Sequence, residues 1–190
     1  MTQPDTKYGL EIPHDKSIEE LILLTKEKPP VCWNAYTALA YNKSDTSLDA
    51  LNSLLTNSDW THIRSAIEAI GNNINGIKLE DILIEFLNSN NKFIVTATIK
   101  ALSNQKSVKS HDKIKALIHF DNLEIKQAAI EGLSNIWQPS DFDILLDLDK
   151  HTGNEKVRKT IGFVLAEHVD KNNWKTFYDN YSRLINILRC

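Results

Sequence analysis

The sequence predicts an all-α fold, a right-handed α-α superhelix of about five helical pairs closed by a C-terminal capping helix. Two observations lead to this fold class. A ten-residue pattern returns five times at nearly constant spacing, and within each copy the apolar residues recur at helical intervals. Stacked repeats of this kind bury a continuous core between neighbours, which a single helical pair cannot form alone.

The repeat is clearest when the five copies are aligned on their last large aliphatic residue, here called the anchor. The anchors are Leu39, Ile70, Leu102, Leu133 and Leu165, so the spacings are 31, 32, 31 and 32 residues. The copies themselves are Val31–Ala40, His62–Gly71, Ile94–Ser103, Ile125–Ser134 and Val157–Ala166. A period this regular indicates repeated copies of one structural unit.

Each copy carries the apolar stripe of a packed helix. Small or β-branched residues stand four positions before the anchors, namely Ala35, Ala66, Thr98, Ala129 and Ile161. A large apolar residue stands eight before the anchor in four copies; His62 interrupts the second copy, where Trp60 or Ile63 replaces it. Because positions i, i+4 and i+8 share one helical face, we expect these segments to be the inner helices of the pairs.

A second apolar-periodic stretch precedes each inner helix and predicts its outer partner. These stretches are Ser17–Glu27, Ser47–Leu55, Lys78–Asn88, Asp112–Phe120 and Ser140–Asp149. Ser17 with Glu20 three residues later forms a capping box, and turn residues such as Pro29-Pro30 fill the junctions. The chain therefore reads as helix–turn–helix five times.

The repeats set the expected domain organisation. Residues 1–16 form an N-terminal arm or a partial N-terminal cap, and residues 17–190 form a single repeat domain. The repeats occupy approximately residues 17–42, 47–74, 78–106, 111–137 and 140–169, and a cap follows at 173–190. The cap is amphipathic, with an apolar face of Trp174, Phe177, Tyr178, Tyr181, Leu184, Ile185 and Leu188.

These inner helices resemble HEAT repeats, in the short form found in phycobilisome-lyase-like HEAT proteins. The second helix of that family reads Val-Arg-x-x-Ala-x-x-Ala-Leu-Gly. The matching residues are Val157-Arg158, Ala66 with Ala69-Ile70-Gly71, Ala101-Leu102-Ser103, and Ile125-Lys126 with Gly132-Leu133-Ser134. The resemblance covers roughly residues 17–170 and implies a fold rather than a function, since these repeats serve many roles.

The resemblance also implies which residues face a partner, because in that family the second helices line the concave surface. The expected positions lie six and two before each anchor and two after it. We call this set the concave ladder: Trp33, Thr37, Tyr41, Arg64, Glu68, Asn72, Thr96, Lys100, Asn104, Gln127, Glu131, Lys159, Phe163 and Glu167. Its mixed polar character with aromatic residues at both ends favours protein recognition over phosphate tracking.

Several aromatic and amide positions have two interpretations. Trp33 and Tyr41 are either interface anchors or, for Trp33, a cover of the N-terminal end of the core. Phe163 is either an exposed contact or packs against the capping helix, while Trp137 and Trp174 are expected in the core or cap. Asn72, Asn104 and Asn135 form either a row of peptide-binding amides or, as we favour, repeated helix C-termini.

Neither a catalytic nor a metal-binding motif is recognisable in the sequence. The six histidines are not spaced as metal ligands and are expected on the surface. A His-Glu dyad, needed by HEAT-type deoxyhypusine hydroxylases, does not occur. Cys32 and Cys190 are too few for a disulfide framework, and Asp141, Asp143, Asp147 and Asp149 are expected on the outer face of the fifth pair. We therefore expect no catalysis and no cofactor.

Charge argues against a nucleic-acid partner. The net charge is −3, and the ladder cations Arg64, Lys100 and Lys159 are opposed by Glu68, Glu131 and Glu167. The basic stretch from Lys100 to Lys115 is expected to be a solvated loop face. HEAT-like alkylpurine DNA glycosylases carry many groove cations and a Trp–Asp constellation, and a nucleic-acid role of that type stays as an alternative.

The expected function is a protein-binding scaffold that uses its concave surface, acting as a monomer. As a small solenoid, the chain resembles HEAT-type immunity proteins, which neutralise bacterial toxins, so a toxin is one candidate partner. An accessory subunit of a lyase-type enzyme is the other alternative. Residues 1–16 lack the apolar core of a signal peptide and the apolar runs are too short for a membrane span, so we expect a cytoplasmic protein.

Overall fold

The computed structural model describes residues 6–7 and 10–188, with side chains for residues 11–181. The chain divides into two compact units, Met1–Ser110 and His111–Cys190. Both are built from helical pairs, so the predicted all-α repeat fold is confirmed. A single repeat domain over residues 17–190 stays a prediction.

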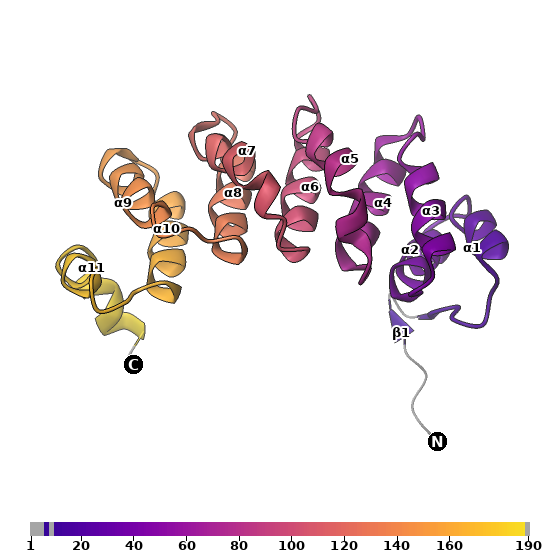
Figure 1. Ribbon diagram of the computed structural model, residues 1–190, viewed down its shortest axis with the longest axis horizontal. Coiled ribbons are helices and arrows are strands. Elements are labelled where there is room, and N and C mark those ends of the chain that lie inside the picture. The colour runs from indigo at the N-terminus through magenta and orange to yellow at the C-terminus, as the bar shows by residue number, and fades with distance from the viewer. Residues whose placement is uncertain (1–5, 8–9, 189–190) are drawn as a thin grey trace, which may run out of the picture. The chain divides into compact units, whose positions relative to one another are not determined.

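The first unit contains three helical pairs after a short hairpin. The outer and inner helices of the first two pairs are α1 (Ile18–Leu24) with α2 (Val31–Tyr41), and α3 (Asp45–Leu54) with α4 (Trp60–Asn72). The third pair joins the 3-10 turn η1 (Gly76–Leu79) and α5 (Glu80–Phe86) to α6 (Lys92–Asn104), and η2 (Val108–Ser110) ends the unit. The inner helices α2, α4 and α6 pack in sequence, as Figure 1 shows.

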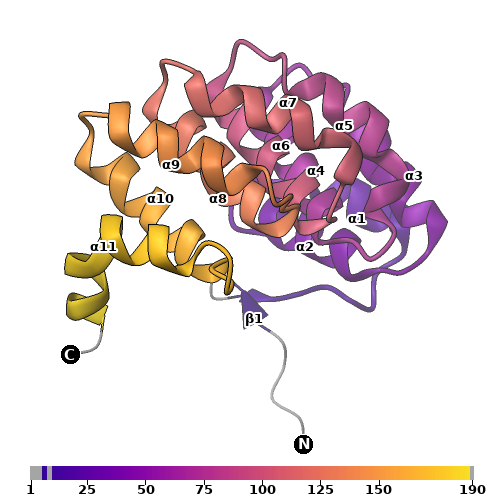
Figure 2. The same cartoon turned by 60° about the vertical axis from the view of Figure 1, so that its left-hand side comes forward.

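The second unit contains two further pairs and a final helix. The pairs are α7 (His111–Ala116), extended by η3 (Leu117–His119), with α8 (Leu123–Asn135), and α9 (Asp141–His151) with α10 (Glu155–Glu167). The last helix is α11 (Trp174–Leu188), which packs against α10 at the end of this unit (Figure 2). All five predicted pairs are therefore present where the repeat placed them.

The core follows the predicted helical stripe. All five anchors and all five residues four positions before them are fully buried, at 0% exposure. Val157, Ile94 and Ile125 are also buried, whereas His62, Ile63 and Trp60 of the second copy all keep some exposure. His62 instead bonds through its Nδ1 to the Tyr36 hydroxyl, at 3.1 Å, which explains how a polar residue is tolerated at that position.

Most inner helices begin at the same kind of residue. The N-caps of α4, α6, α8 and α10 are Asp59, Asn91, Asn122 and Asn154, and each side chain accepts a bond from a main-chain N–H two residues on. Short Asn and Asp side chains satisfy the first free N–H groups of a helix in this way. The predicted capping box of Ser17 and Glu20 is present at the start of α1.

Side-chain amides join successive repeats within the first unit. Asn73 Nδ2 donates to the main-chain oxygens of Leu39 and Asn42, which close α2. One repeat later, Gln105 Nε2 donates to the oxygens of Ile70, Gly71 and Asn73, which close α4. Because the last carbonyl groups of a helix lack partners inside it, these amides cap α2 and α4 from the next repeat.

The row of asparagines at 72, 104 and 135 marks helix C-termini, the interpretation that we favoured. Asn72, Asn104 and Asn135 are the last residues of α4, α6 and α8. Asparagine is common at helix ends because it tolerates left-handed backbone. The three asparagines do not use this property, since the positive φ of a non-glycine residue among the described residues occurs at Lys106, at 53°.

Two predictions about surface residues in the second unit are wrong. His111 is buried at 1% exposure, and its Nε2 lies 2.9 Å from Asp141 Oδ2, whose residue is 0% exposed. Asp149 is also buried, and its carboxylate accepts a bond from Arg158 Nε. The sequence pattern placed these groups outside because charged residues are seldom buried unless they are paired, and their partners lie on other helices.

The two ends of the chain add small features to the repeats. Strands β1 (Thr6–Lys7) and β2 (Leu10–Glu11) form an antiparallel hairpin within the predicted N-terminal arm, and β2 contacts α2. Phe177 and Tyr181 of the predicted cap are buried, whereas Trp174 is 47% exposed rather than part of the core. The cap side chains Leu184, Ile185 and Leu188 lie outside the described residues.

Trp137, the other tryptophan expected in the core or cap, is half-buried. Its ring stacks on His168 with centroids 4.0 Å apart.

Across the described residues, each helix falls short of the length or apolar character that a membrane span requires.

Candidate functional site

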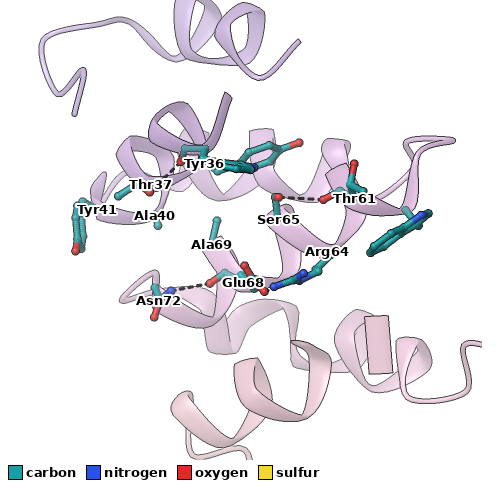
Figure 3. A pocket seen from close by; sticks show the side chains of 12 residues that line it. Tyr36, Thr37, Ala40, Tyr41, Thr61, Arg64, Ser65, Glu68, Ala69 and Asn72 are labelled. Carbon is teal, nitrogen blue, oxygen red and sulfur yellow. Dashed lines mark hydrogen bonds and ion pairs between the residues drawn. The ribbon is translucent and has the colours of Figure 1, made fainter. Parts of the chain in front are cut away.

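A pocket of about 610 Å³ lies on the first unit between the inner helices α2 and α4 (Figure 3). The wall from α2 consists of Trp33, Tyr36, Thr37, Ala40 and Tyr41. The wall from α4 consists of Trp60, Thr61, Arg64, Ser65, Glu68, Ala69 and Asn72. Its volume falls in the range of ligand pockets in proteins.

Helical periodicity explains why these residues face one another. On α2 the lining residues recur every three or four positions from Trp33 to Tyr41, and on α4 they do so from Thr61 to Asn72. Residues at this spacing occupy one face of a helix. Figure 3 accordingly shows Tyr41 and Asn72 toward one end of the pocket and Thr61 toward the other.

Small residues line the pocket where the two helices approach. Ala40 and Ala69 are both buried at 5% exposure and both line the pocket. One repeat later the residue equivalent to Ala40 is Gly71, and a Cβ added there would lie 2.7 Å from the Ala101 Cβ. Glycine lets α4 and α6 come closer than two alanine-bearing helices can, and α4 and α6 form the most extensive contact among the described helices. This difference explains why the hollow lies between α2 and α4.

Aromatic side chains dominate the rim. Trp33 is 43% exposed, Tyr41 55% and Trp60 38%. The Trp60 ring stacks on Phe93, with centroids 5.2 Å apart, and the Tyr41 ring lies 5.9 Å from that of His14. Exposed aromatic rings grouped in this way are typical of binding surfaces.

Tyr36 forms the buried part of the aromatic wall. Its hydroxyl is held by His62 Nδ1, and burial raises the pKa of Tyr36 to about 12. Burial also raises the pKa of the Cys32 thiol, one turn earlier on α2. Both groups therefore stay protonated near neutral pH, and neither provides the anionic form that a nucleophile or a general base requires.

The charged groups of the pocket form one ion pair on α4. Arg64 Nε donates to Glu68 Oε1 at 2.8 Å, one helical turn away, and both side chains are nearly half exposed. Exposed pairs at this spacing stabilise a helix by only about 0.3–0.5 kcal/mol. The pair therefore leaves the pocket electrically balanced and is easily exchanged for a pair with an incoming group.

The structure brings six residues of the predicted concave ladder together in this pocket: Trp33, Thr37, Tyr41, Arg64, Glu68 and Asn72. Thr37 is buried at 8% exposure rather than open to a partner, because its hydroxyl donates to the Trp33 carbonyl oxygen. The remaining five are exposed. Their role in binding stays a prediction.

The other ladder residues lie outside this pocket. Thr96, Lys100 and Asn104 are on α6, with Thr96 half-buried. In the second unit, Gln127 is half-buried and its Nε2 donates to Thr160 Oγ1, while Glu131 is exposed. Lys159 pairs with Glu155, Phe163 is 53% exposed and Glu167 accepts a bond from Ser134. Phe163 is thus more than half exposed, as the interpretation as an exposed contact expects.

The sequence analysis missed half of the lining residues: Tyr36, Ala40, Trp60, Thr61, Ser65 and Ala69. Each of them lies one position from a ladder residue, or three to four positions from one on the same helix. A wider stripe on each inner helix would have included them, because a groove between two helices is lined by more than one row of side chains.

Histidines and carboxylates do not gather into a metal site in the part of the chain that the structure describes. The nearest arrangement is His111 between Asp112 and Asp141 in the second unit. Asp112 is exposed and also accepts a bond from Lys115, so this group is a structural pair with a surface neighbour.

Stacked helical pairs with a pocket on their inner face define a helical-repeat protein of the scaffold type. A family model described as HEAT repeats matches residues 18–103, so the resemblance read from the sequence is confirmed. The matched residues include α2, α4 and therefore the whole pocket. A comparison with curated proteins gives no match.

Solved structures provide further likeness in fold. An engineered protein is 20% identical with a TM-score of 0.54, over 79% of this chain and 78% of that one. The CpcE–CpcF complex of phycocyanin lyase from Nostoc sp. PCC7120 is 15% identical with a TM-score of 0.51, over 78% of this chain. The match spans 64% of the lyase chain, less than two thirds of its length. At these identities the likeness shows the fold alone.

Proposed function

We propose that the chain is a non-catalytic scaffold that binds another protein, and that the pocket between α2 and α4 is its main contact. The observation that carries this proposal is the aromatic rim of Trp33, Tyr41 and Trp60 around a preformed hollow. Tryptophan and tyrosine supply most of the binding energy at protein interfaces when they enter or line such hollows.

The packing of the pocket walls supports tight binding by a rigid surface. Each wall is an α-helix whose opposite side is buried in the core, through Leu39 in α2 and Ile70 in α4. The amide of Asn73 ties the end of α2 to the following repeat. A surface that is already ordered loses little conformational entropy when it binds, so more of the contact energy appears as affinity.

Partner identity distinguishes the more specific versions of this function. In the version that we favour, the scaffold neutralises a toxin by covering it, as a HEAT-type immunity protein. In the second, suggested by the likeness to the phycocyanin lyase complex, it is an accessory subunit of a lyase-type enzyme. The balanced charge of the pocket supports both over a nucleic-acid partner, which requires a continuous row of cations.

The test is affinity capture from the native cell lysate with the full chain as bait. Wild type is compared with Trp33→Ala and with Phe120→Ala, because Phe120 is similarly exposed, at 51%, but lies outside the pocket. We expect one protein to be captured by wild type and by Phe120→Ala. Loss of a central aromatic contact reduces affinity by roughly thirtyfold, so Trp33→Ala should lose it.

Two results would contradict the proposal. Equal capture by Trp33→Ala and wild type would show that the pocket is not the contact. Capture of nuclease-sensitive material alone, released by moderate salt, would indicate nucleic acid instead. If the captured protein is a toxin, the immunity version is supported; if it is a chromophore-carrying protein or its lyase, the accessory version is.

A further inference from the structure

Two hydroxyl groups of the pocket, those of Ser65 and Thr61, already donate a hydrogen bond within the protein. Ser65 Oγ donates to the Thr61 carbonyl oxygen at 2.9 Å. Thr61 Oγ1 donates to Asp59 Oδ1 at 2.8 Å. Since each hydroxyl has one proton and two lone pairs, these two oxygens offer an occupant acceptor sites only.

The longer polar side chains add further acceptors. Asn72 Nδ2 donates to the Glu68 carbonyl oxygen, which leaves the Asn72 Oδ1 as the end that can accept. The Glu68 carboxylate uses Oε1 for Arg64 and keeps Oε2. Arg64 is the cation of this lining and is paired with Glu68, whereas the other polar side chains described here present one carboxylate and several neutral acceptors to whatever enters (Figure 3).

The aromatic walls have the same electrostatic preference. Trp33, Tyr36, Tyr41 and Trp60 line the pocket from both helices. The face of an aromatic ring carries partial negative charge and attracts a cation, most strongly in tryptophan. Acceptor oxygens and ring faces together favour an occupant that is cationic and rich in hydrogen-bond donors.

We propose that the pocket binds an arginine side chain carried by a basic segment of the partner protein; this inference rests on the protein-binding function proposed above. A guanidinium group has five N–H donors and no acceptor, which complements an acceptor-rich lining. Its flat face stacks on tryptophan and tyrosine rings. The net charge of −3 also attracts a basic partner.

Arg64 already makes an arginine–carboxylate contact of this kind in the free protein. It places a guanidinium nitrogen on Glu68 from within α4, in an exposed and weak pair. An arginine that enters the pocket competes with Arg64 for the same carboxylate, and it adds ring contacts with both walls. Removal of Arg64 should therefore strengthen binding, whereas removal of the Glu68 charge should weaken it.

The opposite assignment makes the opposite prediction. If the pocket bound a carboxylate or phosphate through Arg64, then Arg64→Ala would weaken binding and Glu68→Gln, by freeing Arg64, would strengthen it. Arg64 and Glu68 lie one helical turn apart, and both side chains are nearly half exposed, so neither substitution is expected to disturb the fold.

The experiment titrates the full chain with N-acetyl-argininamide and follows the indole N–H signals of Trp33 and Trp60 by NMR. Its matched probes are N-acetyl-citrullinamide, which is neutral and nearly isosteric, and N-acetyl-glutamine amide. We expect saturable shifts of both indoles with arginine at a Kd on the order of 1 mM. Citrulline should bind at least roughly tenfold more weakly, because a hydrogen bond to a charged group is stronger than a neutral one.

Three variants complete the design. Glu68→Gln should weaken arginine binding by roughly tenfold or more, Arg64→Ala should strengthen it a few-fold, and Glu85→Gln on the outer helix α5 should leave it unchanged. Equal binding of arginine and citrulline, no saturable shift, or the reverse order of the two α4 variants would each overturn the inference.

Capture of the partner separates this inference from the function on which it rests. Loss of the captured protein with Trp33→Ala but full retention with Glu68→Gln would keep the protein-binding function and overturn the arginine assignment. Loss with both, together with tighter capture by Arg64→Ala, would support both.

Discussion

Gly71 is the position where the packing of the repeats is most sensitive to a single added atom. It lies in the last turn of α4, facing α6. A Cβ built at Gly71 would lie 2.6 Å from the Ala101 Cα and 2.7 Å from the Ala101 Cβ. Carbon atoms in favourable contact lie about 3.5–4.0 Å apart, so Gly71→Ala forces the two helices to separate.

Two opposing effects determine the magnitude. Alanine is the better helix former, and replacing a helical glycine with alanine stabilises by roughly 0.5–1 kcal/mol. Overpacking of a close contact costs about 1–3 kcal/mol, and here the obstructing atom is main chain, which cannot rotate aside. We therefore expect Gly71→Ala to lower the free energy of unfolding by about 1–2 kcal/mol, and Tm by several degrees at about 2–4 °C per kcal/mol for a chain of this length.

Thermal unfolding followed by circular dichroism measures the change, and amide hydrogen exchange in α4 and α6 assigns it to the first unit. The matched control is Gly153→Ala in the loop before α10, where an added Cβ meets no atom within 4 Å. That variant should match wild type or exceed its stability slightly. A Gly71→Ala protein as stable as wild type would refute the reasoning, because it would mean that α4 and α6 do not approach closely enough to require glycine.

Three other predictions concern polar groups that are buried or half-buried. Gln105→Ala should destabilise the first unit by about 1–3 kcal/mol, since each of three main-chain oxygens loses a hydrogen bond from the amide, whereas Asn104→Ala, at an exposed site, should not; urea unfolding compares the two. Asp141→Ala should destabilise the second unit by about 2 kcal/mol or more because it leaves His111 buried without its carboxylate, while Asp143→Ala on the exposed side should be silent in the same assay. The pKa of Tyr36 is about 12 in the folded state but about 10 when unfolded, so its contribution to the free energy of unfolding is complete below pH 10 and is lost as pH rises to 12. Tyr36→Phe should therefore show a smaller loss of stability than wild type over that interval.

The sequence predicted the fold in detail because the fold depends on a local and repeated signal. The anchors and the small residues four positions earlier are fully buried in all five copies. Each helix pair was located to within a few residues, since the apolar period, the caps and the turns agree with one another. What the period did not show was the unevenness between copies, such as the closer approach of α4 and α6 at Gly71.

The candidate site was predicted only in part, for a physical reason. The repeat register placed Trp33, Tyr41, Arg64 and Glu68 on the inner face, and the structure brings them together in one pocket. The depth of that pocket depends on the distance between two helices, which is a tertiary property. The buried pair of His111 and Asp141 was missed for the same reason: the residues are 30 positions apart, and each alone has the pattern of a surface residue.

The repeats that specify the fold also show where specificity must lie. Positions that build the core are nearly uniform among the five copies, so they cannot distinguish one partner from another. The inner-face positions differ: the first copy has Trp33 and Tyr41 where the third has Thr96 and Asn104. The pocket forms where these aromatic residues meet the charged pair of α4, between the first two copies. In the proposed function, recognition would thus depend on departures from the repeat, and a partner in this pocket would contact two adjacent copies at once.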